Sequence, residues 1–372
     1  MIYLDHAATS PLLQSARREF FRVSEALWGN PNSVHSFGMS AARALESAQN
    51  AFAVCLSCDP EQVIFTSSAT ESCRLATQAL WRRSEKVTIS PYEHKAVHDE
   101  FFSMRSFFCT RTVSDVASRS LAHIHTNNET GAVYDLSAAS DGFDCFFSDC
   151  TAAMGKTRID FRSESFDFIA GAGHKIGAPV GIGVLIAKHP EEIQFFHHPG
   201  TPSVPLASAF AQALYFRTKH LEEFSEIAGI LHDRLIDGVL EEIPDAQLNG
   251  TRWKGNKTTQ SPYIANISFP GVENHALVLR LSADGVMASS GAACSSGDNA
   301  PSRVLIASGY SMQRARSAVR FSFDYRLDPG ADEFYPTFGV NLERDKILVD
   351  SAVKTISKNV QELRKISPVR NA

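Results

Sequence analysis

An acid and a lysine stand at the ends of two successive apolar runs, about one helix–strand unit apart. Asp149 closes the run 145–149, and Lys175 follows the run 166–172 among glycines and a proline. In open α/β sheets, ligands lie beyond the carboxyl ends of the strands. There an acid could hold a protonated pyridine nitrogen, and a lysine could form a Schiff base with an aldehyde. Helix capping by Asp149 and a surface position for Lys175 are the alternatives, but the pairing at this spacing favours the chemical interpretation.

A strand–helix junction and a histidine could add an anion site and a ring contact. In the junction Thr66-Ser-Ser-Ala-Thr70-Glu-Ser72, small residues leave N–H groups and hydroxyls available to an anion at the helix N-terminus. Ser68 to Glu71 also forms a capping box, which is compatible with that role. His94 follows the apolar run 86–90, so its imidazole could stack on a planar ring and move protons near neutral pH. A structural role is the alternative for this histidine.

Three polar positions elsewhere could also take part in chemistry. Cys294 lies among Ala, Ser and Gly residues, which favours an exposed loop where a thiol can act as a nucleophile. Arg320 occupies an inward position in an apolar strand, where its guanidinium would suit a carboxylate. Asn128, in the sequence Asn-Asn-Glu-Thr-Gly, could bring an amide to a ligand. A tolerated free thiol, a structural salt bridge and ordinary turn chemistry are the respective alternatives.

The elements that must position these residues follow two different patterns along the chain. Apolar strands alternate with helical patterns up to about residue 250, which predicts an α/β domain with a mainly parallel sheet. From about residue 263 the pattern is that of an α+β domain with a mixed or antiparallel sheet. We therefore expect a large domain over 14–250 and a small one formed by 1–13 and 251–372. The predicted strands are 62–66, 86–90, 122–126, 145–149, 166–172, 181–187, 263–269, 286–290 and 318–323, and the predicted helices are 39–55, 70–82, 205–223, 275–282, one after Pro301, and 341 to about 365.

Composition excludes some functions. The formal net charge is −5 with no basic run, which argues against direct nucleic-acid binding. No apolar run approaches the roughly 20 residues of a membrane helix, and the N-terminus lacks the features of a signal peptide. The seven cysteines are scattered, which suits a reducing cytoplasm. Cys55 and Cys58 form a C-x-x-C without a second pair, so we expect no metal site.

Taken in order, these segments resemble the fold-type I pyridoxal-phosphate (PLP) enzymes. More narrowly, they resemble the cysteine desulfurases of the class V aminotransferase-like group that serve iron–sulfur cluster assembly, in the branch with a long catalytic loop. The resemblance covers nearly the whole chain. The strongest matches are Ala69-Thr-Glu-Ser72, Glu93-His-Lys-Ala96, Asn127-Asn-Glu129, His174-Lys175 with the Gly-Ile-Gly that follows, and Ser290-Gly-Ala-Ala-Cys294.

The resemblance implies a homodimer with a large PLP domain around a mainly parallel seven-stranded sheet, and a small α+β domain that carries the catalytic cysteine. It implies sulfur transfer from L-cysteine to Cys294 as a persulfide, with release of L-alanine and delivery to an acceptor protein. The implied PLP-binding residues are Lys175 (the Schiff-base lysine), Asp149 (at the ring nitrogen), His94 (stacked on the ring), Ala69, Thr70, His174, Asn128 and, from the partner subunit, Thr201. Asn128 and Arg320 would hold the substrate carboxylate, and Cys294, Lys175 and His94 would be catalytic.

The chain also departs from the family pattern. Ala152 stands where the family usually has Gln, Ala172 replaces a usual Ser, and Arg74 replaces an Asn. The first two changes remove hydrogen bonds to PLP, so we expect weaker retention of the cofactor, which Arg74, His197 or His198 could partly offset. Two alternatives stay open: a PLP-dependent carbon–sulfur or carbon–selenium lyase that does not use Cys294, and a degenerate non-catalytic paralogue.

Overall fold

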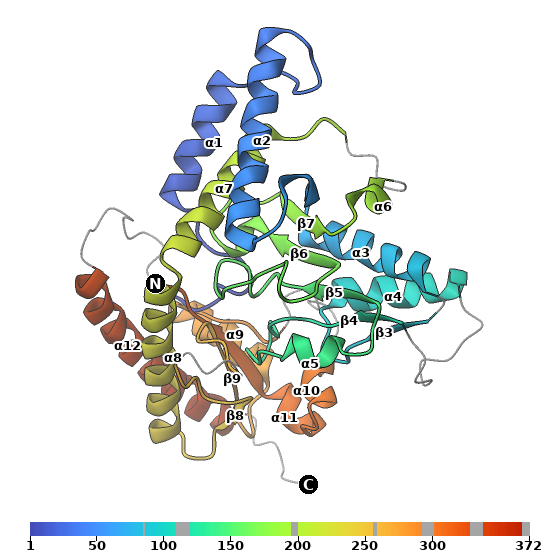
Figure 1. Cartoon of the computed structure of the whole chain (residues 1–372). Helices are drawn as coiled ribbons and strands as arrows, with labels where there is room; N and C mark the ends of the chain where they lie inside the picture. The colour runs from blue at the N-terminus through green and yellow to red at the C-terminus, as the bar shows by residue number, and fades with distance from the viewer. Residues whose placement is uncertain are drawn as a thin grey trace. The chain divides into compact units, whose positions relative to one another are not determined.

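The computed structural model describes residues 1–84, 86–108, 119–194, 200–255, 259–291, 301–327 and 338–366. It divides the chain into two compact units. The central unit contains Ser10–Thr126 and Tyr134–Leu221, and the terminal unit contains Met1–Thr9, Asn127–Val133 and Glu222–Ala372. Each unit is described separately below, with the labels of Figure 1.

The central unit is built around a six-stranded sheet in the order β2-β7-β6-β5-β4-β3. β3 to β6 run parallel to one another, whereas β7 is antiparallel to both of its neighbours, β6 and β2. The strands are β2 (Val63–Thr66), β3 (Val87–Ile89), β4 (Ser120–Ala122), β5 (Cys145–Asp149), β6 (Phe168–Ala172) and β7 (Gly183–Ala187). The helices are α1 (Gln14–Ala26), α2 (Ser36–Leu56), η1 (Pro60–Gln62), α3 (Ala69–Arg83), α4 (Lys95–Phe108), α5 (Leu136–Ser140), η2 (Gly173–Lys175), α6 (Pro190–Gln194) and α7 (Val204–Lys219).

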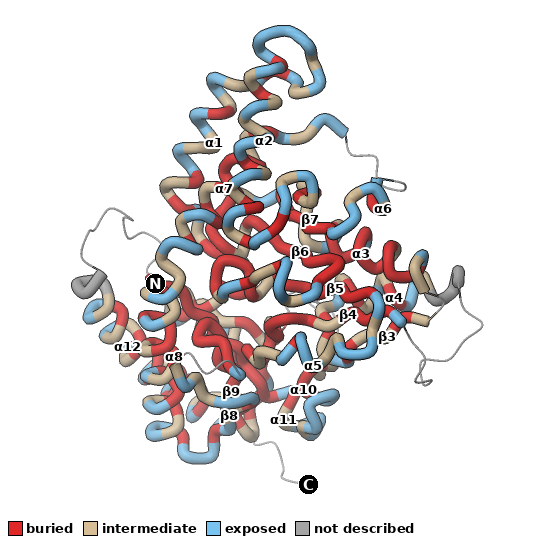
Figure 2. The backbone as a smooth tube through the Cα atoms, viewed as in Figure 1, coloured by how far each residue is buried: buried red, intermediate tan, exposed pale blue. Residues whose placement is uncertain are grey.

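The middle of this sheet is fully covered. Every residue of β5, β6 and β7 is buried, as expected for apolar strands with both faces packed. The buried side of α3 packs on these strands, with Leu75 and Ala79 in one cluster with Phe147 and Phe168. α1, α2 and α7 form a separate helical layer. Figure 2 shows the buried residues of α7 and of the strands in red.

The predicted fold class is confirmed, with three corrections. The sheet has six strands among the described residues rather than seven, and residues 109–118, between α4 and β4, lie outside that part of the chain. β4 was predicted at 122–126, but it ends at Ala122; the N–H groups of His123 and His125 still donate to β5. The helix predicted over 205–223 is two helices that meet at His220. Basic residues end the first and acidic residues begin the second, which matches the helix dipoles at this break.

The terminal unit collects three separate stretches of the chain. Its sheet is antiparallel in the order β11-β9-β8, and β1 pairs in parallel with β10. The elements are β1 (Ile2–Tyr3), α8 (Leu221–Glu242), β8 (Gln247–Asn249), β9 (Ile264–Ser268), α9 (Asn274–Ala283), β10 (Val286–Met287), α10 (Arg303–Ala307), α11 (Met312–Arg316), β11 (Ala318–Ser322) and α12 (Phe338–Ile366). The domain boundary drawn at residue 250 stays a prediction, and the compact units change between Leu221 and Glu222.

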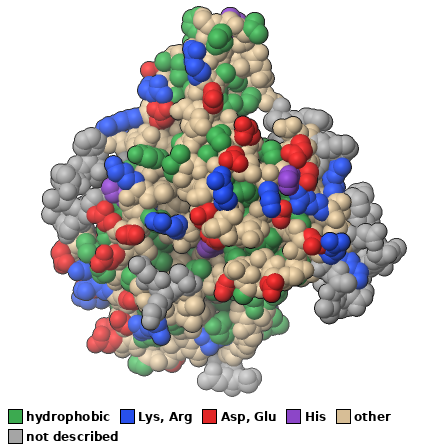
Figure 3. Space-filling model, viewed as in Figure 1, with side chains coloured by type: hydrophobic (Ala, Val, Ile, Leu, Met, Phe, Trp, Pro, Cys, Tyr) green, Lys and Arg blue, Asp and Glu red, His purple; other side chains and the backbone are tan. Residues whose placement is uncertain are grey.

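Charged side chains of both signs share the surface of the molecule. Acidic and basic side chains are mixed over the face shown in Figure 3. None of the described helices is both long enough and apolar enough to cross a membrane. The described residues also contain no cluster of His, Cys, Asp and Glu that could hold a metal ion.

Candidate active site

The candidate residues of the central unit lie at or just after the ends of strands, all at the same edge of the sheet. Asp149 ends β5 and pairs with Ala170, so β6 continues beyond it to Ala172 and then into η2. β7 begins at this edge, with Gly183 opposite Ala172, and β2 ends there, with Thr66 opposite Gly183. The lysine after β6, the helix N-terminus after β2 and the histidine after β3 therefore follow strands that end on the side of Asp149. This is the arrangement predicted from the carboxyl ends of the strands.

Asp149 is a buried carboxylate with no cationic side chain paired to it in the described part of the chain. Its side chain is 4% exposed, and Oδ1 accepts a hydrogen bond from the N–H of Thr151 at 2.9 Å. Among the residues that the structure describes, no Lys, Arg or His forms an ion pair with it. A buried carboxylate is costly without a positive partner, so this position suits a ligand that brings one. Burial raises the pKa of the Cys73 thiol well above its usual range, and the negative charge of Asp149 adds to that effect.

His174 and Lys175 lie in the short helix η2, directly after β6. The backbone carbonyls of both residues accept hydrogen bonds from Ser10, His174 from the N–H at 2.8 Å and Lys175 from the hydroxyl at 3.0 Å. Burial lowers the pKa of His174 to about 4, with smaller contributions from the charges of Lys175 and Lys156. The imidazole is therefore neutral at pH 7 and has one ring N–H to donate. Two hydrogen bonds to one serine thus fix the backbone of the predicted Schiff-base lysine.

The N-terminus of α3 provides the candidate anion site. Ser68 caps the helix by accepting from the Glu71 N–H at 3.2 Å, while the Glu71 carboxylate accepts from the N–H and hydroxyl of Ser67, each at 2.7 Å. The N–H groups of Ala69 and Thr70 have no hydrogen-bond partner among the described residues. Together with the positive end of a 15-residue helix, they can hold a phosphate.

Gly183 explains how this helix N-terminus reaches the sheet edge. A Cβ at this position would lie 2.3 Å from the carbonyl carbon of Ser68 and 2.7 Å from the N atom of Ala69. Only glycine allows β7 to begin this close to the start of α3. The glycine-rich sequence after Lys175 therefore has a packing reason in addition to the family pattern.

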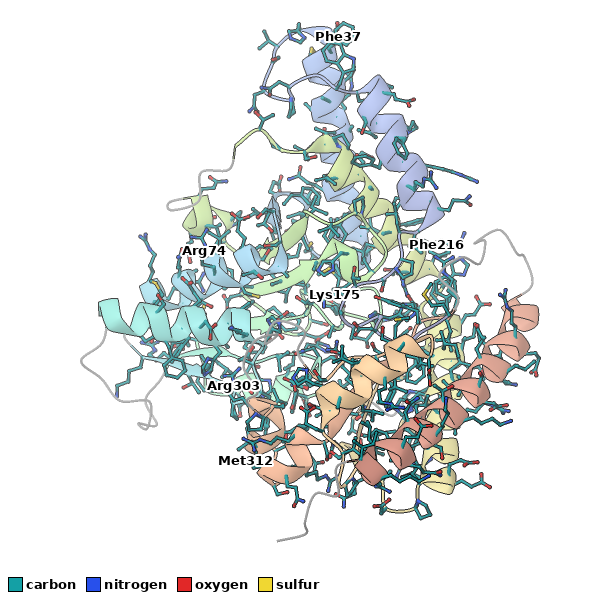
Figure 4. All side chains as sticks on the ribbon, turned by 180° about the vertical axis from the view of Figure 1, so that it is seen from behind. Phe37, Arg74, Lys175, Phe216, Arg303 and Met312 are labelled. Carbon is teal, nitrogen blue, oxygen red and sulfur yellow. The ribbon has the colours of Figure 1, made fainter. Side chains whose placement is uncertain are left out.

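Arg74 does not join this group through any described contact. Its side chain is about half exposed, and its nearest ionic partner is Glu71, 3.9 Å away on the same helix. Figure 4 shows Arg74 separated from Lys175. The described contacts give no support to the hypothesis that Arg74 offsets the missing PLP contacts.

His94 stands at the start of α4, just after β3. Its Nδ1 accepts a hydrogen bond from the N–H of Ala96 at 3.1 Å, so the neutral ring carries its proton on Nε2. The preceding Glu93 is buried and accepts from the N–H of Ile124 at 2.6 Å, which ties this turn to the segment that follows β4. The turn is therefore fixed, while stacking of His94 on a cofactor ring stays a prediction.

The terminal unit brings Arg320, Asn128 and Asp5 together. The Arg320 side chain is buried; it donates to the backbone carbonyl of Asn128 at 2.8 Å and to the carboxylate of Asp5 at 3.0 Å. Its Nε–H is also buried and has no partner within the described chain. A salt bridge is thus present, and donor capacity for a carboxylate remains. Binding of the substrate carboxylate by Arg320 and Asn128 stays a prediction.

Two predicted residues receive little or no description. Thr201 is exposed in the turn before α7. Cys294 lies outside the described residues, as does Cys109. The five described cysteines are free, and burial raises the thiol pKa of each of them. None of these five therefore has the features of a reactive thiolate.

Sequence reasoning missed charged residues that lie near the candidate residues in the fold but apart from them in the sequence. Asp5, which holds Arg320, and Lys156, a buried cation near His174, were not singled out. Glu129 was noted only as part of a motif, although it is buried and accepts a hydrogen bond from Ser302. Buried charges at these positions are visible only once the fold is known.

The residues present fit PLP. Asp149 can pair with a protonated ring nitrogen, Lys175 can take an aldehyde, and the open N–H groups at the start of α3 can take a phosphate. Ala172 is buried and Ala152 half-buried, and neither has a polar side chain to contribute to the cofactor. The fit thus holds for the main contacts and lacks two that the family usually has.

Comparisons with known proteins identify the family of this chain. The family model described as aminotransferase class-V matches residues 2–104, 111–199 and 191–328. An IscS-like cysteine desulfurase of Mycobacterium tuberculosis is 32% identical, over 87% of this chain and 92% of its own. A cysteine desulfurase of Nostoc is 28% identical, over 100% of this chain and 96% of its own. A solved structure of a NifS-like protein superposes with a TM-score of 0.79 at 20% identity, over 97% of this chain and 99% of its own.

The chain therefore belongs to the aminotransferase class-V family. Its matched relatives are cysteine desulfurases, which confirms the resemblance and the enzyme class predicted from the sequence. The mixed, mostly parallel sheet is the fold of the NifS-like structure.

Proposed function

We propose that this cysteine desulfurase binds PLP and transfers the sulfur of L-cysteine to its own Cys294. The observation that carries the proposal is that buried Asp149, which has no ion pair with a described residue, and Lys175, which follows the next strand, stand at the same edge of the sheet. A structural carboxylate at such a site would be expected to have a positive partner from the protein itself. The open N-terminus of α3 at the same edge supports the assignment.

PLP, when bound, would supply an aldehyde and a ring that withdraws electrons from the substrate Cα. The roles of the protein residues follow from their surroundings. Asp149 would keep the ring nitrogen protonated, and the N–H groups of Ala69 and Thr70 with neutral His174 would hold the phosphate. Lys175 would carry the amine that exchanges with the substrate amine and then moves the Cα proton.

The sulfur step needs a thiolate outside the described cysteines, because burial raises the pKa of all five of these. Cys294, in its sequence of small residues, is the candidate. Its sulfur would form a bond to the sulfur of L-cysteine while the Cβ–S bond of the substrate breaks, and the substrate carbon would gain a proton. The products are L-alanine and a Cys294 persulfide, so no external oxidant or reductant is required.

Further parts of the proposal concern partners and location. We propose a homodimer in which Thr201, exposed in the turn before α7, contacts PLP of the partner subunit, as the family resemblance implies. Asn128 and Arg320 would hold the substrate carboxylate. The persulfide would pass to an acceptor protein rather than directly to a nucleic acid. Free thiols at all five described cysteines support a reducing, cytoplasmic location.

Replacement of Cys294 with Ala, with Cys109→Ala as the control, tests the proposal. We expect PLP-loaded wild-type protein and Cys109→Ala to release sulfide from L-cysteine in the presence of a reductant. We also expect mass spectrometry to find one extra sulfur atom on Cys294. Cys294→Ala should retain the absorbance change on adding L-cysteine but form no sulfide.

The same experiment separates the alternatives. Continued sulfide release by Cys294→Ala would indicate a lyase that does not use this thiol. A wild-type protein that gains no absorbance band with PLP would indicate a non-catalytic paralogue. Either result would refute the proposed function.

A further inference from the structure

Glu129 is a buried acid that the proposed function leaves without a task. It is 6% exposed and lies in the Asn127–Val133 stretch of the terminal unit. Its N–H donates to Oδ1 of Asn127 at 2.9 Å, and its carbonyl accepts from Nδ2 of Asn266 in β9 at 3.1 Å. Asn266 in turn accepts from Asn249 of β8 at 2.7 Å. The backbone of Glu129 is thus held by a buried amide network anchored in the sheet.

The Glu129 carboxylate accepts a hydrogen bond from the chain just after the segment 292–300 and lies close to Gly291, just before that segment. Oε2 accepts a hydrogen bond from the hydroxyl of Ser302, which also caps α10 by accepting from the N–H of Leu305 at 3.1 Å. On the other side, a Cβ at Gly291 would lie 3.5 Å from the same Oε2 atom. Gly291 is the last described residue before the segment, and Ser302 is the second one after it. One carboxylate oxygen is therefore hydrogen-bonded to the chain just after the Cys294 segment and lies close to Gly291, just before that segment.

The first of these ends is also tied to the strand that carries Arg320. Ser289 and Arg320 exchange two backbone hydrogen bonds, of 2.7 and 3.1 Å, and the Ser289 hydroxyl donates to the carbonyl of Gly291 at 2.7 Å. Burial raises the pKa of Glu129, while the Ser302 hydroxyl and the charge of Arg320 lower it. An acid in such surroundings costs stability unless it is well compensated, and an apolar residue would fill the space more cheaply. The position of this carboxylate between the two ends suggests a reason for its presence.

We propose that Glu129 is a positioning residue for Cys294: its carboxylate anchors Ser302 close to Gly291 and thereby fixes where the chain resumes after the segment that carries the thiol. The inference rests on the proposed function only in assigning the sulfur-accepting role to Cys294. Glu129 itself touches no reacting atom and acts through its hydrogen bond with Ser302.

Two rates test this role, one of them independent of PLP. The first is the alkylation of Cys294 by iodoacetamide in protein without PLP, followed by peptide mass spectrometry. The second is the formation of the Cys294 persulfide from L-cysteine in PLP-loaded protein. Glu129→Ala and Ser302→Ala break the link, whereas Glu129→Gln can still accept from Ser302, and Ser302→Asn can still donate and cap α10.

Ser311→Ala is the matched control. Ser311 caps the five-residue helix α11 by accepting from the N–H of Arg314 at 3.2 Å, as Ser302 caps the five-residue α10, but it has no contact with Glu129. It therefore reports what the loss of a cap alone does.

We expect Glu129→Ala and Ser302→Ala to slow persulfide formation by about ten- to a hundredfold, the size of effect that a misplaced nucleophile produces. The KM for L-cysteine should change by less than about threefold, because substrate binding is not the step affected. Both variants should change the alkylation rate in the same direction, and the double variant should be no slower than the slower single one. Glu129→Gln, Ser302→Asn and Ser311→Ala should stay near wild type.

Unchanged persulfide formation in Glu129→Ala and Ser302→Ala would overturn the inference, as would an equal loss in Ser311→Ala. Additive effects in the double variant would also overturn it, because they would mean that Glu129 does not act through Ser302. If Glu129→Ala does not fold, the Ser302→Ala, Ser302→Asn and Ser311→Ala comparison decides the question. If wild-type protein forms no persulfide, the proposed function fails, and the alkylation rates still decide the role of Glu129.

Discussion

Replacement of Asp149 with Asn tests whether this carboxylate serves to bind a cofactor or to stabilise the fold. In the protein without PLP, the side-chain carbonyl of the new asparagine would still accept the hydrogen bond from the N–H of Thr151. The replacement would also remove a buried charge that has no cation among the described residues. We therefore expect the free energy of unfolding of the PLP-free protein to stay within about 1 kcal/mol of wild type, or to rise.

The affinity for PLP should respond in the opposite sense. A hydrogen bond between a carboxylate and a protonated ring nitrogen is charge-assisted, and such bonds contribute about 1.5–3 kcal/mol. Its loss corresponds to a roughly 10- to 150-fold weaker Kd, measured by titrating PLP into dialysed protein and following the absorbance of the bound cofactor.

Asp167→Asn is the matched control because Asp167 is also a buried acid and directly precedes β6 of the same sheet. It pairs with Arg83 at 2.8 Å and accepts from the N–H of Phe146 at 2.9 Å. Its replacement should lower the free energy of unfolding by about 1–3 kcal/mol and leave the PLP affinity unchanged. The reasoning is refuted if Asp149→Asn binds PLP as tightly as wild type, or if it destabilises the PLP-free protein as much as Asp167→Asn does.

Three further outcomes are expected. Ala172→Ser should tighten PLP binding by about threefold or more because it restores a hydroxyl that the family uses; weaker binding would mean that the buried hydroxyl finds no partner. Burial lowers the pKa of His125 to about 4, so only the unfolded state takes up a proton at this residue as the pH falls from 6.5 toward 5. The wild-type protein should therefore lose about 2 kcal/mol of its free energy of unfolding between pH 7 and pH 5 because of this group. Urea unfolding at the two pH values should show this loss in wild type and not in His125→Gln. Gly183→Ala should cost about 1–3 kcal/mol of stability and weaken PLP binding, since its Cβ would collide with Ser68. Gly200→Ala, whose Cβ would have no described atom within 4 Å, should leave stability unchanged, and an equal loss of stability in the two variants would contradict the packing argument.

The local parts of the fold could be predicted because each has a local cause. The bounds of β5 were predicted correctly, since an apolar run that ends in Asp149 marks both ends of the strand. The shared edge of Asp149 and Lys175 followed from a general property of parallel strands. The break at His220 was missed, although the change from basic to acidic residues around it marks two helix termini.

Contacts between distant segments could not be predicted in this way. Arg320 pairs with Asp5 across 315 residues, and Glu129 meets Ser302 across 173 residues. Such pairs depend on how three stretches of chain assemble into one unit, which no periodicity in the sequence records. A residue such as Glu129 therefore looks like part of a turn until its burial and its partner are known.

The division of the terminal unit into three stretches has a consequence for synthesis on the ribosome. β1 must wait for β10, and Asp5 for Arg320, while nearly the whole chain is made. At about 5–20 residues per second this wait is roughly 15–60 s. The central unit contains no residue after Leu221, so every residue of its sheet edge, Asp149 and Lys175 included, is made much earlier. The residues of this edge that are proposed to bind PLP are therefore all translated before the segment that carries Cys294.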